Sequence, residues 1–96
     1  MADDENIKRV RMPKDGEVLG QVEGAVGGGK YQVRCQDGNM RLCRIPGSKK
    51  RDIWLRDGDI VIVEPWKVQS DERGNIVWRY RKAQAQWLKK KGILKL

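Results

Sequence analysis

Basic side chains gather in the middle of the chain around one tryptophan, and their spacing is suited to holding a polyanion. Arg41 and Arg44 lie on a predicted strand, and a short basic turn with Trp54 follows. That turn carries three consecutive cations, Lys49, Lys50 and Arg51. Adjacent like charges repel one another unless an anion lies close by. The pattern therefore favours binding to a phosphate backbone, with arginine planes and an indole ring available to stack on bases.

Catalytic chemistry is poorly supported by the same sequence. The chain contains no histidine, and residues 27–29 (Gly-Gly-Gly) lack the spacing of a phosphate-binding loop. The Asp-Gly-Asp of residues 57–59 is first of all a turn former. Cys35 and Cys43 lack zinc-ligand spacing and are expected to be reduced thiols on strands. We therefore predict no enzymatic activity, no metal and no cofactor.

Length and charge narrow the class of protein. The 96 residues suffice for one domain with a modest core, and 21 Lys and Arg against 13 Asp and Glu leave a net charge of +8. Such an excess also serves solubility, but here it is concentrated in residues 48–56 and from Lys67 onward. The N-terminus has no apolar signal segment, and no run approaches the roughly 20 apolar residues of a membrane span. A cytoplasmic monomer that binds nucleic acid, with no membrane partner, is expected.

Strand-like stretches alternate with glycine-containing turns along most of the chain. Strands are predicted over residues 17–26, 30–36, 39–45, 60–63 and 76–81. Between the third and fourth strands, residues 48–53 leave room for a turn or a short helix capped by Ser48. Residues 83–91 favour helix, and Gly92 is placed as its C-terminal cap.

The turn at Asp37-Gly38 predicts a tight hairpin and, with it, a register. If the loop has two residues, Gln36 pairs with Asn39, and Arg34 then lies opposite Arg41. Like charges directly across a hairpin are unfavourable. An anion lying over the two arginines explains the pair, and so does a solvent-facing pair that splays apart.

Five strands with a short helical link between strands three and four predict an all-β OB-fold barrel followed by a C-terminal α-helix. An SH3-like barrel and another small β-roll are the alternatives. We expect a flexible N-terminal arm over 1–16, the RNA-binding barrel over 17–82, and a helix and tail over 83–96. An OB barrel binds nucleic acid through strands two and three and the adjoining loops. The cations on these elements are Lys30, Arg34, Arg41, Arg44 and Lys67.

Three runs resemble archaeal translation initiation factor 1A and, more distantly, its eukaryotic counterpart and bacterial initiation factor one. They are RLCRIPG (41–47), SKKRDIWLRDGDIVIV (48–63) and IVWRYRKAQAQWLKKKG (76–92), and the likeness covers roughly residues 11–92. The resemblance implies an OB-fold factor that binds the small ribosomal subunit at the aminoacyl-tRNA site through ribosomal RNA. It also implies help in placing initiator methionyl-tRNA, with the initiator tRNA complex and other initiation factors as partners.

The family's RNA-facing positions map onto both strand arginines, the basic turn, its tryptophan and one later lysine. These are Arg41, Arg44, Lys49, Lys50, Arg51, Trp54 and Lys67. The chain departs from eukaryotic members in its short, charge-balanced N-terminal arm and in lacking an acidic C-terminal tail. Functions that depend on those tails, such as contact with the subunit-joining GTPase, are therefore not carried over.

Two other functions stay open at this point, as do purely structural roles for several residues. The first alternative is a general single-strand RNA-binding or chaperone OB protein, and the second is an interaction or assembly module using the apolar tail at residues 93–96. Trp54 sits between two aliphatic residues, which favours packing at one end of the barrel over stacking on a base. The remaining aromatics are expected in the core or wall, with one docking the helix: Tyr31, Trp66, Trp78, Tyr80 and Trp87.

Overall fold

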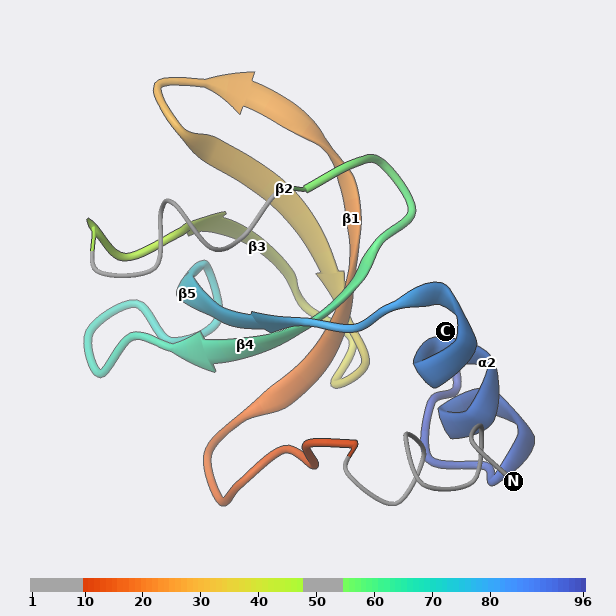
Figure 1. Ribbon diagram of the computed structural model, residues 1–96. Coiled ribbons are helices and arrows are strands. Elements are labelled where there is room, and N and C mark those ends of the chain that lie inside the picture. Colours follow the sequence, from red (N-terminus) through yellow and green to blue (C-terminus); the bar gives the residue numbers. More distant parts are fainter. Residues whose placement is uncertain (1–9, 48–54) are drawn as a thin grey trace.

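The computed structural model describes residues 10–47 and 55–96, in which five strands close into a barrel followed by a helix (Figure 1). The elements are β1 (Val18–Gly27), β2 (Lys30–Cys35), β3 (Met40–Arg44), β4 (Ile60–Pro65), β5 (Arg73–Arg79) and α2 (Lys82–Lys90). The strand order is β1-β2-β3-β5-β4, in which only the β3–β5 pair is parallel. The predicted five-stranded barrel and C-terminal helix are confirmed. The predicted helical link falls on residues 48–54, outside the described part of the chain.

Strand β1 belongs to both sides of the barrel, because it pairs with β4 through residues 18–21 and with β2 from Gly20 onward. Such sharing requires a strongly coiled strand. At Gly20 an added Cβ would lie 2.5 Å from Val33 Cγ1, so only glycine lets β2 approach this closely. A register irregularity between Val22 and Gly24 bends the strand further.

The β2–β3 hairpin has a three-residue loop over residues 36–38, and the predicted two-residue loop is wrong. The Cys35 N–H donates to the Asn39 carbonyl at 2.9 Å, and Gly38 has a φ of 95°, the left-handed conformation that closes such a loop. Gln36 is the first residue of the loop. Its backbone N–H donates to the Leu19 carbonyl of β1 and does not pair with β3.

This change of register moves every β3 side chain to the opposite face from the predicted one. Val33 now lies opposite Arg41, and both residues are buried. The predicted pairing of Arg34 with Arg41 is therefore wrong. Across the outer face of the hairpin the like-charged pair is instead Lys30 opposite Arg44, and both residues are exposed.

Strand β5 starts at Arg73, three residues before the predicted start, because residues 73–75 pair with β3 in parallel and close the barrel. Gly74 makes the closure possible. An added Cβ there would lie 2.6 Å from Val63 Cγ1 and 3.2 Å from the Glu64 carbonyl oxygen. The polar sequence of residues 73–75 does not by itself predict that they pair with β3, which is distant along the chain.

We expect Gly74→Ala to lower the free energy of unfolding by about 1–3 kcal/mol, the usual cost of overpacking a filled core. Val63 is buried and β-branched, so its methyl group has little freedom to move away. Urea unfolding measures the effect, with Gly47→Ala as the matched control, since nothing lies within 4 Å of a Cβ at Gly47. Equal stability of the two variants would show that the closure tolerates a side chain.

Two apolar clusters hold the molecule together. The first fills the barrel and contains Val22, Val33, Cys35, Cys43, Ile45, Val61, Val63 and Ile76. The second lies between the outer wall of the barrel and the C-terminal elements and contains Leu19, Ile60, Ile62, Tyr80, Leu88 and Leu94. Helix α2 therefore packs on the outside of the barrel (Figure 1).

The helix ends as predicted, at a glycine in the left-handed conformation. Gly92 has a φ of 77°, and the N–H groups of Gly92 and Ile93 donate to the carbonyls of Lys89 and Leu88, which is a Schellman motif. After the helix, the side-chain amide of Gln36 forms two hydrogen bonds with the backbone of the tail. It donates to the Ile93 carbonyl at 2.9 Å and accepts from the Lys95 N–H at 2.7 Å. The apolar tail is thus docked on the barrel, where Leu94 is buried, and does not form an exposed patch.

Residues 10–16, within the predicted arm, lie against the barrel. Arg11 forms an ion pair with Glu17 at 3.3 Å, and its carbonyl accepts a hydrogen bond from the Tyr80 hydroxyl. Burial raises the pKa of Tyr80 to about 12, so this hydroxyl keeps its proton and remains a donor. Residues 1–9 lie outside the described part.

Candidate nucleic-acid interface

The outward side chains of the β2–β3 hairpin form a face of mixed basic and apolar character. Alternation along the two strands places six residues on it: Lys30, Gln32, Arg34, Met40, Leu42 and Arg44. Lys30 and Arg44 are direct cross-strand neighbours, and like charges in that position are destabilising without a counter-ion. This end of the hairpin is therefore the place where an anion would relieve the largest repulsion.

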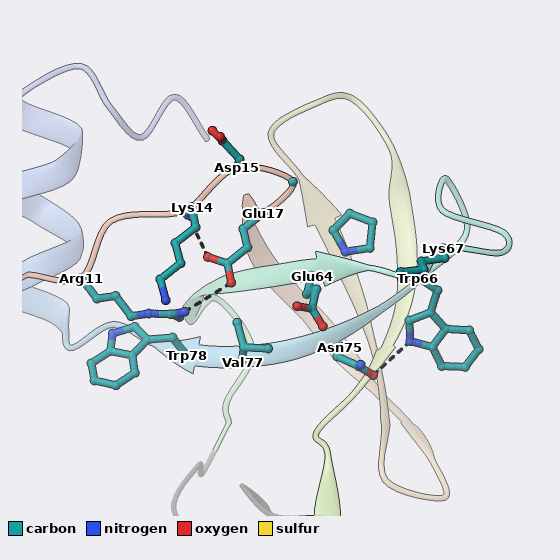
Figure 2. A pocket seen from close by; sticks show the side chains of 12 residues that line it. Arg11, Lys14, Asp15, Glu17, Glu64, Trp66, Lys67, Asn75, Val77 and Trp78 are labelled. Carbon is teal, nitrogen blue, oxygen red and sulfur yellow. Dashed lines mark hydrogen bonds and ion pairs between the residues drawn. The ribbon is translucent and has the colours of Figure 1, made fainter.

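Arg44 is held against an aromatic ring. Its guanidinium lies 5.6 Å from the centroid of the Trp66 ring, and the Trp66 indole N–H donates to Asn75 Oδ1 at 3.0 Å (Figure 2). The hydrogen bond fixes the ring, and the ring in turn holds the arginine. The result is a positioned planar cation on the outer surface, next to the β4–β5 loop, which also contains exposed Lys67.

Trp66 is predicted in the core or wall, and the sequence does not indicate its contact with Arg44. It follows β4 directly and begins the loop between β4 and β5, one of the loops by which OB barrels bind nucleic acid. That position is a signal which sequence reasoning could have used. The structure thus places the predicted residue Arg44 on this ring and the predicted residue Lys67 in the same loop as the ring.

Arg34 lies at the rim of the face with its charge partly offset. It donates to Gln21 Oε1 at 2.8 Å and pairs with Glu23 at 3.2 Å. The two paired side chains are 52% and 43% exposed, and exposed pairs of this kind contribute little to stability.

Arg41 requires a correction, because its side chain points into the protein and is not one of the exposed cations. The residue is 2% exposed. Two of its nitrogens donate to the carboxylate oxygens of Asp37 at 2.9 and 2.8 Å, and Nε donates to the Ser70 carbonyl at 2.6 Å. Arg41 therefore ties the β2–β3 loop to the β4–β5 loop, and its contacts are structural.

These hydrogen bonds change the acidity of the carboxylate. The Arg41 guanidinium holds the pKa of Asp37 below its ordinary value of 3.8. In return, the hydrogen bonds to Asp37 raise the pKa of Arg41 above its own ordinary value. A carboxylate with a lowered folded-state pKa contributes stability above its unfolded pKa, and that contribution disappears as the pH falls through the folded value.

We therefore expect the free energy of unfolding to decline as the pH falls below about 4, and Asp37→Asn to flatten that decline. The asparagine variant should be less stable than the wild type at pH 6, and the two should converge in acid. Urea unfolding of both proteins between pH 6 and pH 2.5 measures this. Parallel pH profiles would show that another carboxylate carries the acid sensitivity.

Lys49, Lys50, Arg51 and Trp54 lie outside the described residues, so their predicted role in RNA contact stays a prediction. Cys35 and Cys43 are free and buried, as expected of reduced thiols on strands. Burial raises the pKa of both thiols, that of Cys43 to about 12. Within residues 10–47 and 55–96, no three His, Cys, Asp or Glu side chains gather as metal ligands.

A closed five-stranded barrel, with exposed cations on the outer side of its second and third strands and a fixed aromatic ring beside Arg44, defines an OB-fold protein of the RNA-binding class. The family of translation initiation factor 1A and bacterial initiation factor one matches residues 7–95, and the chain belongs to this family. The resemblance drawn from the three sequence runs is thereby confirmed. Membership of this family gives the chain a role in translation initiation, in association with the ribosome.

Individual relatives agree with the family assignment. Translation initiation factor 1A of Methanothermobacter thermautotrophicus is 52% identical over 92 residues, covering 96% of this chain and 93% of the relative. The factor of the same name from Methanococcus aeolicus is 55% identical over 89 residues, covering 91% and 85%. The solution structure of translation initiation factor one from the Wolbachia endosymbiont of Brugia malayi superposes with a TM-score of 0.55 at 25% identity, covering 85% of this chain and 91% of that one.

No helix in the described ranges is long and apolar enough to cross a membrane.

Proposed function

We propose that the chain binds the small ribosomal subunit at the aminoacyl-tRNA site, through ribosomal RNA, and promotes placement of initiator methionyl-tRNA. The observation that carries the proposal is the outer face of β2 and β3, where Lys30 opposes Arg44 and Arg44 lies on Trp66. Family membership supplies the ribosomal setting. In this proposal the chain acts as a cytoplasmic monomer that works by binding, without catalysis.

Attachment comes mainly from phosphate contacts. Lys30, Arg44 and Lys67 are exposed, and each phosphate that they neutralise releases condensed counterions and strengthens binding at low salt. The three consecutive cations at residues 49–51 are proposed to add further phosphate contacts. Arg34 joins at the rim if a phosphate replaces Glu23 as its partner.

Selectivity for a folded ribosomal RNA comes from shape. Bases that are splayed out of a helix stack on aromatic rings and on arginine planes. The Arg44 guanidinium, held over the fixed Trp66 ring, offers such a plane with little loss of side-chain entropy on binding. Trp54 is proposed as a second stacking residue.

Occupying the aminoacyl-tRNA site would assist initiation in two ways. The bound factor blocks entry of other tRNAs, so that the initiator tRNA complex is placed next to an empty and protected site. It also favours the subunit conformation to which it binds best, which shifts the population toward that state. Other initiation factors are proposed to bind the same subunit alongside it.

Cosedimentation tests the proposal, with small subunits, large subunits and a single-stranded RNA oligonucleotide run in parallel at low and moderate salt. We expect stoichiometric binding to small subunits alone that survives moderate salt and is displaced by a ligand of the aminoacyl-tRNA site. Equal binding to all three that disappears together as salt rises would instead indicate a general single-strand RNA-binding protein. Stable small-subunit binding without displacement would reject the proposed site.

A further inference from the structure

A second surface feature lies on the outer side of β4 and β5, where residues 11–17 run alongside the strands and enclose a hollow of about 860 Å³ (Figure 2). Trp66 stands at one end and Trp78 at the other, with Glu64 and Asn75 between them. Pro65 and Val77 add apolar surface to the lining. The hollow adjoins the RNA-binding surface proposed for β2 and β3 and shares Trp66 and Lys67 with it.

Trp78 was expected in the core or wall, but the structure leaves it 38% exposed. The Arg11 guanidinium lies 5.7 Å from its ring centroid, and Arg11 is itself fixed by Glu17 and Tyr80. Both tryptophans of the hollow are thus paired with arginines and held in place. Rigid, partly exposed tryptophan and arginine side chains are characteristic of the energetic centres of protein interfaces.

The charge of the lining argues against a nucleic acid here. Its ionisable side chains are three cations and three carboxylates: Arg11, Lys14, Lys67, Asp15, Glu17 and Glu64. A balanced hollow on a chain of net charge +8 is a poor place for a polyanion, since phosphate binding is driven by an excess of cations. A protein segment, which carries both signs of charge, is the better match.

Glu64 indicates the chemistry of that segment. It is exposed between the two tryptophans and forms no ion pair within the described residues. A guanidinium placed over Glu64 would form a charge-assisted hydrogen bond to the carboxylate. An apolar side chain beside it would contact Val77 and the indole surfaces.

We propose that this hollow docks a protein segment that carries an arginine next to an aromatic residue. The arginine pairs with Glu64, and the aromatic ring packs between Trp66 and Trp78. This docking hollow shares Trp66 and Lys67 with the proposed RNA-binding surface, and peptide binding to it is measured without ribosomes.

The test follows the indole N–H signals of the ¹⁵N-labelled protein by NMR while Ac-Phe-Arg-NH₂, Ac-Phe-Glu-NH₂ or AMP is added, with Trp66→Phe and Trp78→Phe used to assign the signals. We expect Ac-Phe-Arg-NH₂ to shift the signals of Trp66 and Trp78, and to bind about two- to fivefold more tightly than Ac-Phe-Glu-NH₂, as one exposed ion pair allows. The Trp87 signal, on α2, should stay in place.

Charge reversal provides the second arm of the test. Glu64→Lys should invert the preference between the two dipeptides, whereas Glu23→Lys, an exposed carboxylate on β1, should leave it unchanged. Equal binding of both dipeptides, or an unchanged preference in Glu64→Lys, would overturn the proposal. A larger shift of Trp66 and Trp78 with AMP would also overturn it and would mark the hollow as a nucleotide-binding surface.

Discussion

Replacing Arg41 with alanine is expected to lower the free energy of unfolding by about 2–4 kcal/mol. The change leaves a cavity and removes all three hydrogen bonds that join Asp37 to the Ser70 carbonyl through the guanidinium. Loss of one partner from a fully buried ion pair costs about 3–5 kcal/mol. The lower range applies because the Asp37 side chain is 33% exposed and water can solvate part of the carboxylate that remains. Urea unfolding at neutral pH measures the loss.

Arg44→Ala is the matched control for this prediction, being the same substitution on the outer side of the same strand. It should change the free energy of unfolding by less than about 1 kcal/mol, because Arg44 is exposed. Arg41→Lys should fall between wild type and Arg41→Ala, since an ammonium group cannot reproduce the two parallel bonds to Asp37. A stable Arg41→Ala protein that no longer binds small subunits would contradict the structural role and restore Arg41 as an RNA contact.

Neutralising the outer face is expected to weaken small-subunit binding by about 10- to 100-fold at moderate salt, which corresponds to about 1.4–2.8 kcal/mol. The variant is Lys30→Gln, Arg44→Gln and Lys67→Gln combined. If each residue neutralises one phosphate, the slope of log K against log salt should become less steep by about two. Binding titrations at four or five salt concentrations give both quantities.

The control removes three charges elsewhere, through Lys89→Gln, Lys90→Gln and Lys95→Gln at the end of α2 and in the tail. These residues are also exposed, so the net charge changes equally while the β2–β3 face stays intact. We expect this control to lose less than about threefold in affinity. Equal losses in the two triple variants would mean that binding follows total charge and that the face has no special role.

Local sequence signals predicted the elements well, and what they missed depends on long-range contacts. The strands, the C-terminal helix and its Gly92 cap could be predicted because alternation, helix propensity and a left-handed glycine act over a few residues. The start of β5 could not be predicted from its polar residues, because the strand begins where pairing with β3 closes the barrel.

The error in register shows why the candidate site could be predicted only in part. An Asp-Gly pair is compatible with a two-residue or a three-residue loop, and the difference of one residue decides whether Arg41 or Arg44 faces outward. Arg41 is drawn inward by Asp37 and by Ser70, a residue far along the chain. Trp66 and Trp78 are predicted in the core or wall because a chain without phenylalanine must build its aromatic core from Trp and Tyr. Only the positions of Arg44 and Arg11 reveal why these two rings remain at the surface.

Directed cleavage of ribosomal RNA tests the central claim most directly, and the buried cysteines make it practical. Cys35 and Cys43 are 2% and 0% exposed, so a new surface cysteine can be labelled selectively with an iron chelate that cuts nearby RNA. Gln32→Cys places the chelate on the outer face of β2, and Gln86→Cys places it on exposed α2. We predict that the chelate at position 32 cuts small-subunit RNA in the aminoacyl-tRNA site, and that the chelate at position 86 gives a different and weaker pattern there. Cleavage from position 32 that falls outside that site, or the same pattern from both positions, would contradict binding through the β2–β3 face.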